Sequence, residues 1–165
     1  ILEINFSSSL ATNTLDSVTV YYKGAPANSG FGSFIQTTHA GIPIIWTLSE
    51  PFGAQDWWPC KQDLNDKIDS IDIIVTTPQA NRVASNGVLV SEIASGTNKT
   101  YHWKSRYKIA TYLIAIAVTN YAAYSDSLFI HNDTLEILNL HPAYLHMPIP
   151  VFYSQDVVQT KMNVR

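Results

Sequence analysis

One segment of the sequence, Ser49–Asp63, concentrates residue types that bind ligands. It carries a carboxylate at Glu50, the adjacent pair Trp57 and Trp58, and the single cysteine of the chain, Cys60. Its apolar residues follow neither the two-residue period of a strand nor the 3.6-residue period of a helix. We therefore predict a long packed loop between strands, a kind of segment that often carries function when a rigid scaffold holds it.

Glu50 is the carboxylate that its position singles out. It precedes Pro51, which favours an extended backbone, and it follows an apolar run typical of a strand. A carboxylate fixed there can pair with a ligand ammonium group through a charge-assisted hydrogen bond. On residue type alone, a solvated glutamate at a strand end is the commoner case.

The tryptophan pair also has two interpretations. Side chains of consecutive residues in an extended chain point to opposite faces, so Trp57 and Trp58 are not expected to stack on one ligand together. Aromatic residues that anchor the loop or core are more common than a sugar-stacking platform.

Other site chemistries leave no pattern in the sequence. The five histidines give no H-E-x-x-H pair, the seven glycines form no phosphate-binding loop, and Cys60 has no second cysteine to pair with. No catalytic residue and no metal ligand is therefore assigned, and no cofactor is expected to bind these residues.

The composition sets the class of protein. The 165 residues are 46% hydrophobic and only 14% charged, with a net charge of −3, which excludes a disordered tail and gives no basic surface for nucleic acid. No apolar run approaches the roughly 18 residues that span a bilayer, so no membrane-spanning segment is expected. The alternating residues from Ile1 onward indicate a piece cut from a longer protein.

The sequence on either side of the loop predicts short strands, and no segment has the pattern of a long amphipathic helix. We expect strands at Leu2–Phe6, Ser17–Tyr22, Ser33–Gln36, Ile44–Thr47, Ser70–Thr77, Arg82–Ala84, Leu89–Ile93, Thr100–Lys104, Thr111–Ala117, Ala122–Ser125 and Leu135–Leu138. Asn86-Gly87 and Ser95–Asn98 predict hairpin turns. The predicted fold is all-β, an antiparallel β-sandwich, and the prolines after His141 predict an irregular C-terminal tail.

The candidate loop also carries a resemblance to a known family. The run Trp46–Lys61, read as WTLSEPFGAQDWWPCK, is similar to the signature segment in the N-terminal β-domain of the aminopeptidase N family of zinc metallopeptidases, particularly its bacterial members. Further similar segments follow in the family's order and extend the match over most of Leu2 to Asp126. They are Asp66-Lys67, Ser70–Thr77, Val83–Gly87, Tyr101–Trp103 and Ala110–Val118.

The resemblance implies a saddle-like β-sandwich over residues 1–140, followed by an irregular tail or linker over residues 141–165. In the family this domain packs over a thermolysin-like catalytic domain of the same chain, which predicts a hydrophobic docking face here. Family members remove N-terminal residues from peptides, and the glutamate of the x-E-P segment binds the substrate's free α-amino group. That role maps onto Glu50 as a substrate-binding residue.

The family's catalytic machinery does not map onto this sequence. The chain has no G-x-M-E-N segment and no H-E-x-x-H motif, so the zinc of the parent enzyme is expected in a following domain, and these residues alone are expected to be inactive. Gln62 replaces an aspartate of the family pattern, which predicts a weaker loop-capping contact, and Thr119 replaces a glycine. The tail after Leu140 matches poorly.

Two other functions stay open. The chain is alternatively a free-standing β-sandwich binding module for carbohydrate or protein, or a stand-alone remnant that keeps the fold without its catalytic partner. Exposed Trp57 and Trp58 together with a Glu50 held inside the domain would favour the binding module. The family's frequent export in bacteria suggests an exported or cell-envelope location.

Overall fold

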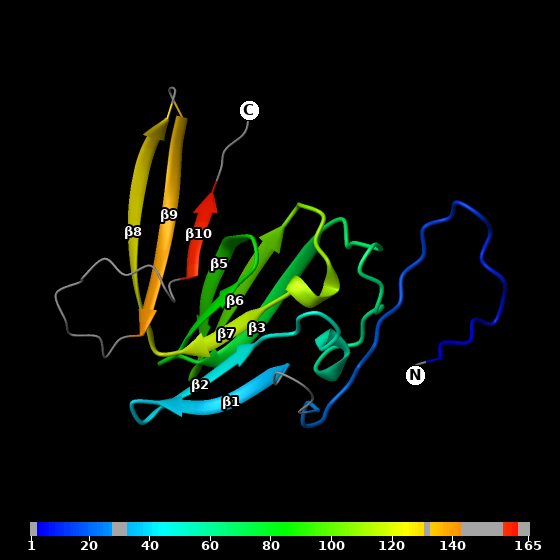
Figure 1. The fold of residues 1–165 in the computed structure, drawn as a ribbon, viewed down its shortest axis with the longest axis horizontal. Coiled ribbons are helices and arrows are strands. Elements are labelled where there is room, and N and C mark those ends of the chain that lie inside the picture. Colours follow the sequence, from blue (N-terminus) through cyan, green and yellow to red (C-terminus); the bar gives the residue numbers. More distant parts are fainter. Residues whose placement is uncertain (1–2, 28–32, 131–132, 143–156, 162–165) are drawn as a thin grey trace.

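A computed structural model describes residues 3–27, 33–130, 133–142 and 157–161 (Figure 1). Its strands are β1 (Phe34–His39), β2 (Ile42–Thr47), β3 (Ile71–Pro78), β4 (Arg82–Ser85), β5 (Val88–Ser95), β6 (Asn98–Ser105), β7 (Ile116–Thr119), β8 (Tyr121–Ile130), β9 (Asp133–Pro142) and β10 (Val157–Lys161). Two single-turn 3₁₀ helices, η1 (Ala54–Asp56) and η2 (Thr111–Leu113), interrupt the loops. No described helix is long and apolar enough to cross a membrane.

The strands form antiparallel sheets, which confirms the predicted fold class. One sheet has the order β1-β2-β7-β4, a second has the order β3-β6-β5, and a third has the order β10-β9-β8. The first two enclose a common core. Of its buried members, Val83 and Val118 come from the first sheet, and Tyr101 and Trp103 come from the second. Side chains from both sheets therefore make one sandwich core.

The two predicted turns have different outcomes. Gly96 closes the β5–β6 hairpin with positive φ, and Ser95 pairs with Asn98, so this prediction is confirmed. Asn86-Gly87 is not a hairpin, because β4 pairs with β7 whereas β5 pairs with β6. The chain instead crosses from one sheet to the other there. Gly87 has φ of +90°, and an added Cβ would lie 2.1 Å from the Lys104 carbonyl oxygen, so only glycine fits this crossing.

The strand predicted at Thr111–Ala117 begins later than expected. Residues Thr111–Leu113 form η2 and the strand itself is β7. The Asn86 side chain replaces a strand neighbour here, since it donates to the Leu113 carbonyl (2.9 Å) and accepts from the Ala115 N–H (2.6 Å). An asparagine amide thus satisfies backbone groups that a sheet ladder would otherwise use.

The two N-terminal strand predictions are wrong over the described residues. Residues 3–6 and 17–22 are irregular, although their residues alternate as strand residues do. In Figure 1 this N-terminal segment begins away from the sheets and then runs beside the loop that contains η1 toward β1. A strand requires a hydrogen-bonded neighbour, and none of the described strands pairs with these residues.

The C-terminal region adds one strand that sequence patterns did not predict. The short strand β10 pairs antiparallel with β9, from Val157 opposite Leu140 to Lys161 opposite Glu136. Pro142, the first proline after His141, is the last residue of β9, where it lies opposite Tyr121 of β8. Residues 143–156 and 162–165 of the predicted irregular tail lie outside the described residues.

Candidate functional site

The Glu50 loop is a compact turn packed around a buried alanine. Ala54, the first residue of η1, is fully buried, and the Gly53 N–H donates to the Ser49 carbonyl at 2.8 Å. Gly53 is needed for close packing, because an added Cβ would lie 1.9 Å from Ser33 Oγ and 3.3 Å from Ser49 Cα. The irregular sequence therefore folds into a defined structure, as predicted for a packed loop.

A buried polar network fixes the residue next to Glu50. Ser49 is 3% exposed, and its Oγ accepts a hydrogen bond from Trp57 Nε1 at 2.9 Å. Ser33, also 3% exposed, donates from its Oγ to Asp56 Oδ2 at 2.7 Å. These contacts connect the start of β1, the end of β2 and η1, so the backbone that carries Glu50 is held from three directions.

Glu50 itself is exposed, and its peptide bond to Pro51 is cis. Its carboxylate has no hydrogen bond or ion pair with any residue in the described parts of the chain. A rigid backbone thus presents a carboxylate that is available to a cation. A ligand ammonium group is the chemistry that such a carboxylate binds best.

The two tryptophans do not form a flat platform. Both are half-buried, and their rings are inclined by 51° with centroids 6.0 Å apart. Trp57 also lies 6.3 Å from the Phe34 ring, and its indole N–H is used by Ser49. This agrees with the interpretation of these residues as loop anchors and not as a sugar-stacking surface.

The two departures from the family pattern both make contacts. Gln62 Nε2 donates to the Phe52 carbonyl at 2.9 Å, a bond that an aspartate carboxylate could not donate, and Gln62 Oε1 has no hydrogen-bond partner among the described residues. Thr119 is 2% exposed, and its Oγ1 donates to the Pro43 carbonyl at 2.8 Å. Each of the two residues therefore donates a side-chain hydrogen bond to the backbone carbonyl of another residue.

The remaining polar groups of the loop give no catalytic arrangement. Cys60 is partly buried, and this burial raises the pKa of its thiol, against the opposing effect of a hydrogen bond with Thr111. Such a thiol is a poor nucleophile at neutral pH. Lys61 forms exposed ion pairs with Asp63 and Asp66. Across the described ranges, no three His, Cys, Asp or Glu side chains are grouped as metal ligands would be, so a zinc ion does not fit these residues.

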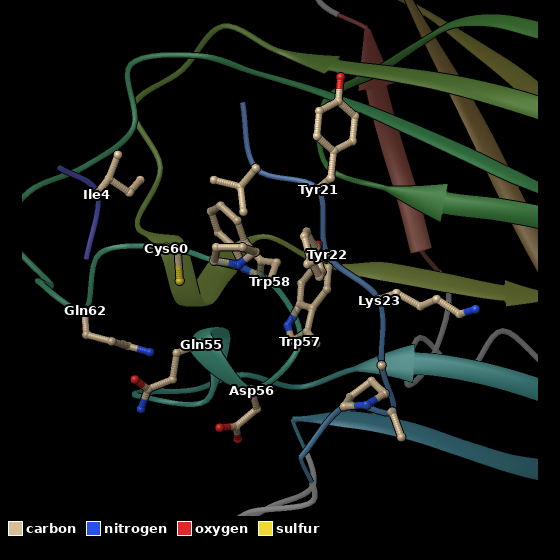
Figure 2. A pocket seen from close by; sticks show the side chains of 15 residues that line it. Ile4, Tyr21, Tyr22, Lys23, Gln55, Asp56, Trp57, Trp58, Cys60 and Gln62 are labelled. Carbon is tan, nitrogen blue, oxygen red and sulfur yellow. The ribbon is translucent and has the colours of Figure 1, made fainter. Parts of the chain in front are cut away.

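A cavity that sequence reasoning missed lies on one side of this loop (Figure 2). It has a volume of about 950 Å³, and Glu50 is not among its lining residues. One wall is the N-terminal segment, including Tyr21 and Tyr22, and the other is the loop, including Trp57, Trp58 and Gln62. In the sequence the cavity is marked only by two aromatic pairs, Tyr21-Tyr22 and Trp57-Trp58. The first pair lies in a segment that we predicted to be a strand.

Comparison with known proteins relates this fold to one class of enzyme. No protein-family model matches the chain, and no curated protein matches it. Among solved structures, an M1 zinc metallopeptidase from Deinococcus radiodurans has 22% identity and a TM-score of 0.57, with 68% of this chain and 26% of that chain covered. A mutant from the same organism bound to a Tyr-Ser-Ala substrate has 20% identity and a TM-score of 0.60, with 78% and 31% covered. A two-domain M1 metallopeptidase mutant bound to L-tryptophan has 22% identity and a TM-score of 0.56, with 68% and 27% covered.

These similarities establish a shared fold. The chain adopts the fold of one part of the M1 zinc metallopeptidases, which confirms the fold that the sequence resemblance implied. It spans 26–31% of the length of those structures.

Proposed function

We propose that this chain is the N-terminal domain of an M1-type zinc aminopeptidase and that Glu50 binds the α-ammonium group of the peptide substrate. The observation that carries the proposal is Glu50 itself. It is an exposed carboxylate without a partner among the described residues, on a loop that buried contacts at Ser49 hold in place. The shared fold with M1 metallopeptidases supports the same assignment, since one of them binds the tripeptide Tyr-Ser-Ala and another binds L-tryptophan.

The chemistry of the proposed role is selection for a free N-terminus. An anionic group at a closed end of a binding site attracts a substrate ammonium, and it disfavours internal peptide segments, which lack that charge. The zinc that activates water and polarises the scissile carbonyl would belong to a catalytic domain of the same parent chain. This chain would contribute substrate recognition by a single carboxylate.

The test is Glu50→Ala in the complete parent enzyme, assayed on amino-acid amides. The expected result is a fall in kcat/KM on the order of a hundredfold or more, because a desolvated substrate ammonium loses its counter-ion. Glu50→Gln should recover part of the loss through hydrogen bonding alone. Glu3→Ala, which removes an exposed carboxylate from the N-terminal segment, is the matched control and should leave kcat/KM unchanged.

Unchanged kinetics in Glu50→Ala would refute the proposed role. The alternative of a free-standing carbohydrate module required an exposed tryptophan pair and an enclosed Glu50. The half-buried, inclined tryptophans and the exposed glutamate do not favour it.

A further inference from the structure

The sheet β3-β6-β5 has an outer face that points away from the sandwich core. On β6, Tyr101 and Trp103 are buried in that core, so the residues that alternate with them point outward. Each of these residues lies opposite an outward residue of β3, and the pairs are Thr100 with Thr76, His102 with Ile74, and Lys104 with Asp72. Ile93 of β5 lies opposite Thr100 and extends the same face. Charged, hydroxyl and aliphatic side chains therefore share this outer face.

Positive charge is concentrated in the strand at the middle of the outer face. Between Glu92 and Asp126 the sequence has no Asp or Glu, whereas it has Lys99, Lys104, Arg106 and Lys108. The chain as a whole has a net charge of −3. β6 and the residues just after it therefore form a basic region within an acidic chain.

One carboxylate on the outer face is shared by three basic side chains. Asp72 Oδ1 lies 2.7 Å from His102 Nε2 and 3.7 Å from Lys104 Nζ, and Asp72 Oδ2 accepts from Arg106 at 3.2 Å. The hydrogen bonds from His102 and Arg106 lower the pKa of Asp72, so this carboxylate is ionised at neutral pH. A single negative charge cannot balance both Lys104 and Arg106. Positive charge is therefore in surplus on two side chains that are 38% and 50% exposed.

Aliphatic side chains lie next to this charge. Ile74 follows Asp72 on the outer side of β3 and is 66% exposed, and Ile93 is 61% exposed. Thr76 and Thr100 adjoin the two isoleucines in the strand register, and their hydroxyl groups bond to each other at 2.8 Å. The solvated face of an antiparallel sheet is normally polar. Two uncovered isoleucines beside hydroxyls that bond each other therefore favour contact with a further apolar surface.

We propose that the outer face binds an acidic segment of another protein that also carries aliphatic side chains. Carboxylates of that segment would pair with Lys104 and Arg106, whose charge Asp72 leaves partly unbalanced. Its aliphatic side chains would cover Ile74 and Ile93. The contact requires no free peptide N-terminus and no zinc, so it is independent of the peptidase function proposed above.

A nucleic acid fits this face less well. Asp72 contacts each of the basic groups and would repel phosphates that approach them. Single strands also bind by stacking their bases on aromatic rings, whereas the apolar groups exposed beside the charges, Ile74 and Ile93, are aliphatic. An acidic protein segment with aliphatic residues complements both parts of the face.

The test titrates three peptides into the 165-residue chain and follows the backbone amides by ¹H–¹⁵N NMR. All three are acetylated and amidated, so their termini carry no charge. The peptide ESESLSL presents its glutamates and leucines on one side when extended, QSQSLSL lacks the charges, and ESESSSS lacks the leucines. We expect ESESLSL to bind roughly threefold or more tightly than either control. Its advantage over QSQSLSL should disappear in about 0.5 M NaCl, because salt screens exposed ion pairs.

Two pairs of variants assign the binding to the outer face. Lys104→Gln/Arg106→Gln should lower the affinity for ESESLSL to that for QSQSLSL. Lys23→Gln/Lys61→Gln is the matched control, because it changes the net charge equally at two exposed lysines of the N-terminal segment and the Glu50 loop. It should leave the difference between the peptides intact.

The second pair tests the aliphatic contact. Ile74→Ser should weaken ESESLSL roughly threefold and leave ESESSSS unaffected. Val18→Ser removes a side chain that is 50% exposed in the N-terminal segment, and it should change neither affinity.

Four results would overturn the proposal. Equal affinity for ESESLSL and QSQSLSL would mean that the positive charge contributes nothing, and equal affinity for ESESLSL and ESESSSS would mean the same for the isoleucines. Tighter binding of an oligothymidylate would assign the face to nucleic acid. Unmoved amide signals in β3 and β6 at millimolar ESESLSL would mean that the face does not bind such a segment. The peptide comparison uses the unaltered chain, so it stands even where a variant fails to fold.

Discussion

Two of the described segments outside the sheets are held in opposite ways. The Glu50 loop, residues 49–63, has an irregular sequence but packs closely, with Ser49 and Ala54 buried. The N-terminal segment, residues 3–27, alternates like a strand, yet Leu15 and Tyr21 are almost completely exposed. In the described structure its backbone is tied to the rest of the fold by one hydrogen bond, from the Ala27 N–H to the Asp56 carbonyl.

The difference shows what orders a segment without a sheet ladder. Side-chain hydrogen bonds hold the loop without a neighbouring strand: Trp57 and Gln62 bond across it, and Ser33, which precedes β1, bonds to Asp56. The N-terminal segment has strand-forming residues and no partner strand among those described. Alternation of apolar and polar residues therefore shows that a segment can form a strand. Whether it does depends on a neighbouring strand whose backbone groups can form hydrogen bonds with it.

The largest expected effect comes from adding one methyl group to each segment. Gly53→Ala places a Cβ 1.9 Å from Ser33 Oγ and 2.9 Å from Ser33 Cβ, so a buried side chain must shift. We expect a loss of about 1–3 kcal/mol in the free energy of unfolding, typical of overpacking. Urea denaturation followed by circular dichroism measures this loss.

The matched change in the other segment is Gly24→Ala. No atom lies within 4 Å of the added Cβ, so the free energy of unfolding should change by less than about 0.5 kcal/mol. Equal effects at the two glycines would contradict the contrast between a packed loop and a loosely attached segment.

A smaller effect is expected from removing a single hydrogen bond in each segment. Ser33→Ala leaves the Asp56 carboxylate without its 2.7 Å hydrogen bond from a buried hydroxyl, and it should cost about 1–2 kcal/mol. Asp16→Ala removes an exposed contact to the Ser17 N–H and should change stability by less than about 0.5 kcal/mol. The same urea titrations measure both.

The Ser33→Ala/Gly53→Ala double variant sharpens this test. Removing Ser33 Oγ also removes the closest atom that the new methyl group would meet. The double variant should therefore be less destabilised than the sum of the two single variants, whereas strict additivity would mean that the two residues do not interact.

Much of the sandwich was predictable from the sequence because its strands find partners. β3, β5 and β6 appear within a few residues of their predicted bounds, since each alternating run pairs with another along its length. Turn chemistry was less reliable. Asn86-Gly87 carries a hairpin signal, but pairing of β4 with β7 makes it a crossing between sheets. A turn motif specifies local backbone geometry and leaves the choice of partner strand to the packing.

The candidate site was predictable to a different degree in its two parts. Glu50 stood out through its position in a recognisable motif, and that motif needs no knowledge of distant contacts. The cavity could not be predicted, because its two walls, the N-terminal segment and the loop, are far apart in the sequence. An unpaired atom such as Trp58 Nε1 is a property of the folded structure and leaves no trace in sequence patterns.

The smallest expected effect is on the reactivity of Cys60, which lines the cavity between the two segments. Burial raises the pKa of its thiol, so at a given pH less of it is the reactive thiolate, and alkylation by iodoacetamide should be slower than for an exposed peptide cysteine. The midpoint of the pH–rate profile should accordingly lie above that of the free thiol. Cys60 is the single cysteine of the chain, so the rate reports this position alone.

Deleting residues 1–27 makes this measurement a direct test of the contrast. The N-terminal segment forms one wall of the cavity, so its removal should expose Cys60 to water and move the midpoint back toward the ordinary value for a thiol, with severalfold faster alkylation at neutral pH. Stability should fall little, because few contacts tie this segment to the sheets. An unchanged profile after the deletion would mean that the loop alone buries Cys60. A large loss of stability would mean that the N-terminal segment is as firmly integrated as the Glu50 loop, and the contrast would fail.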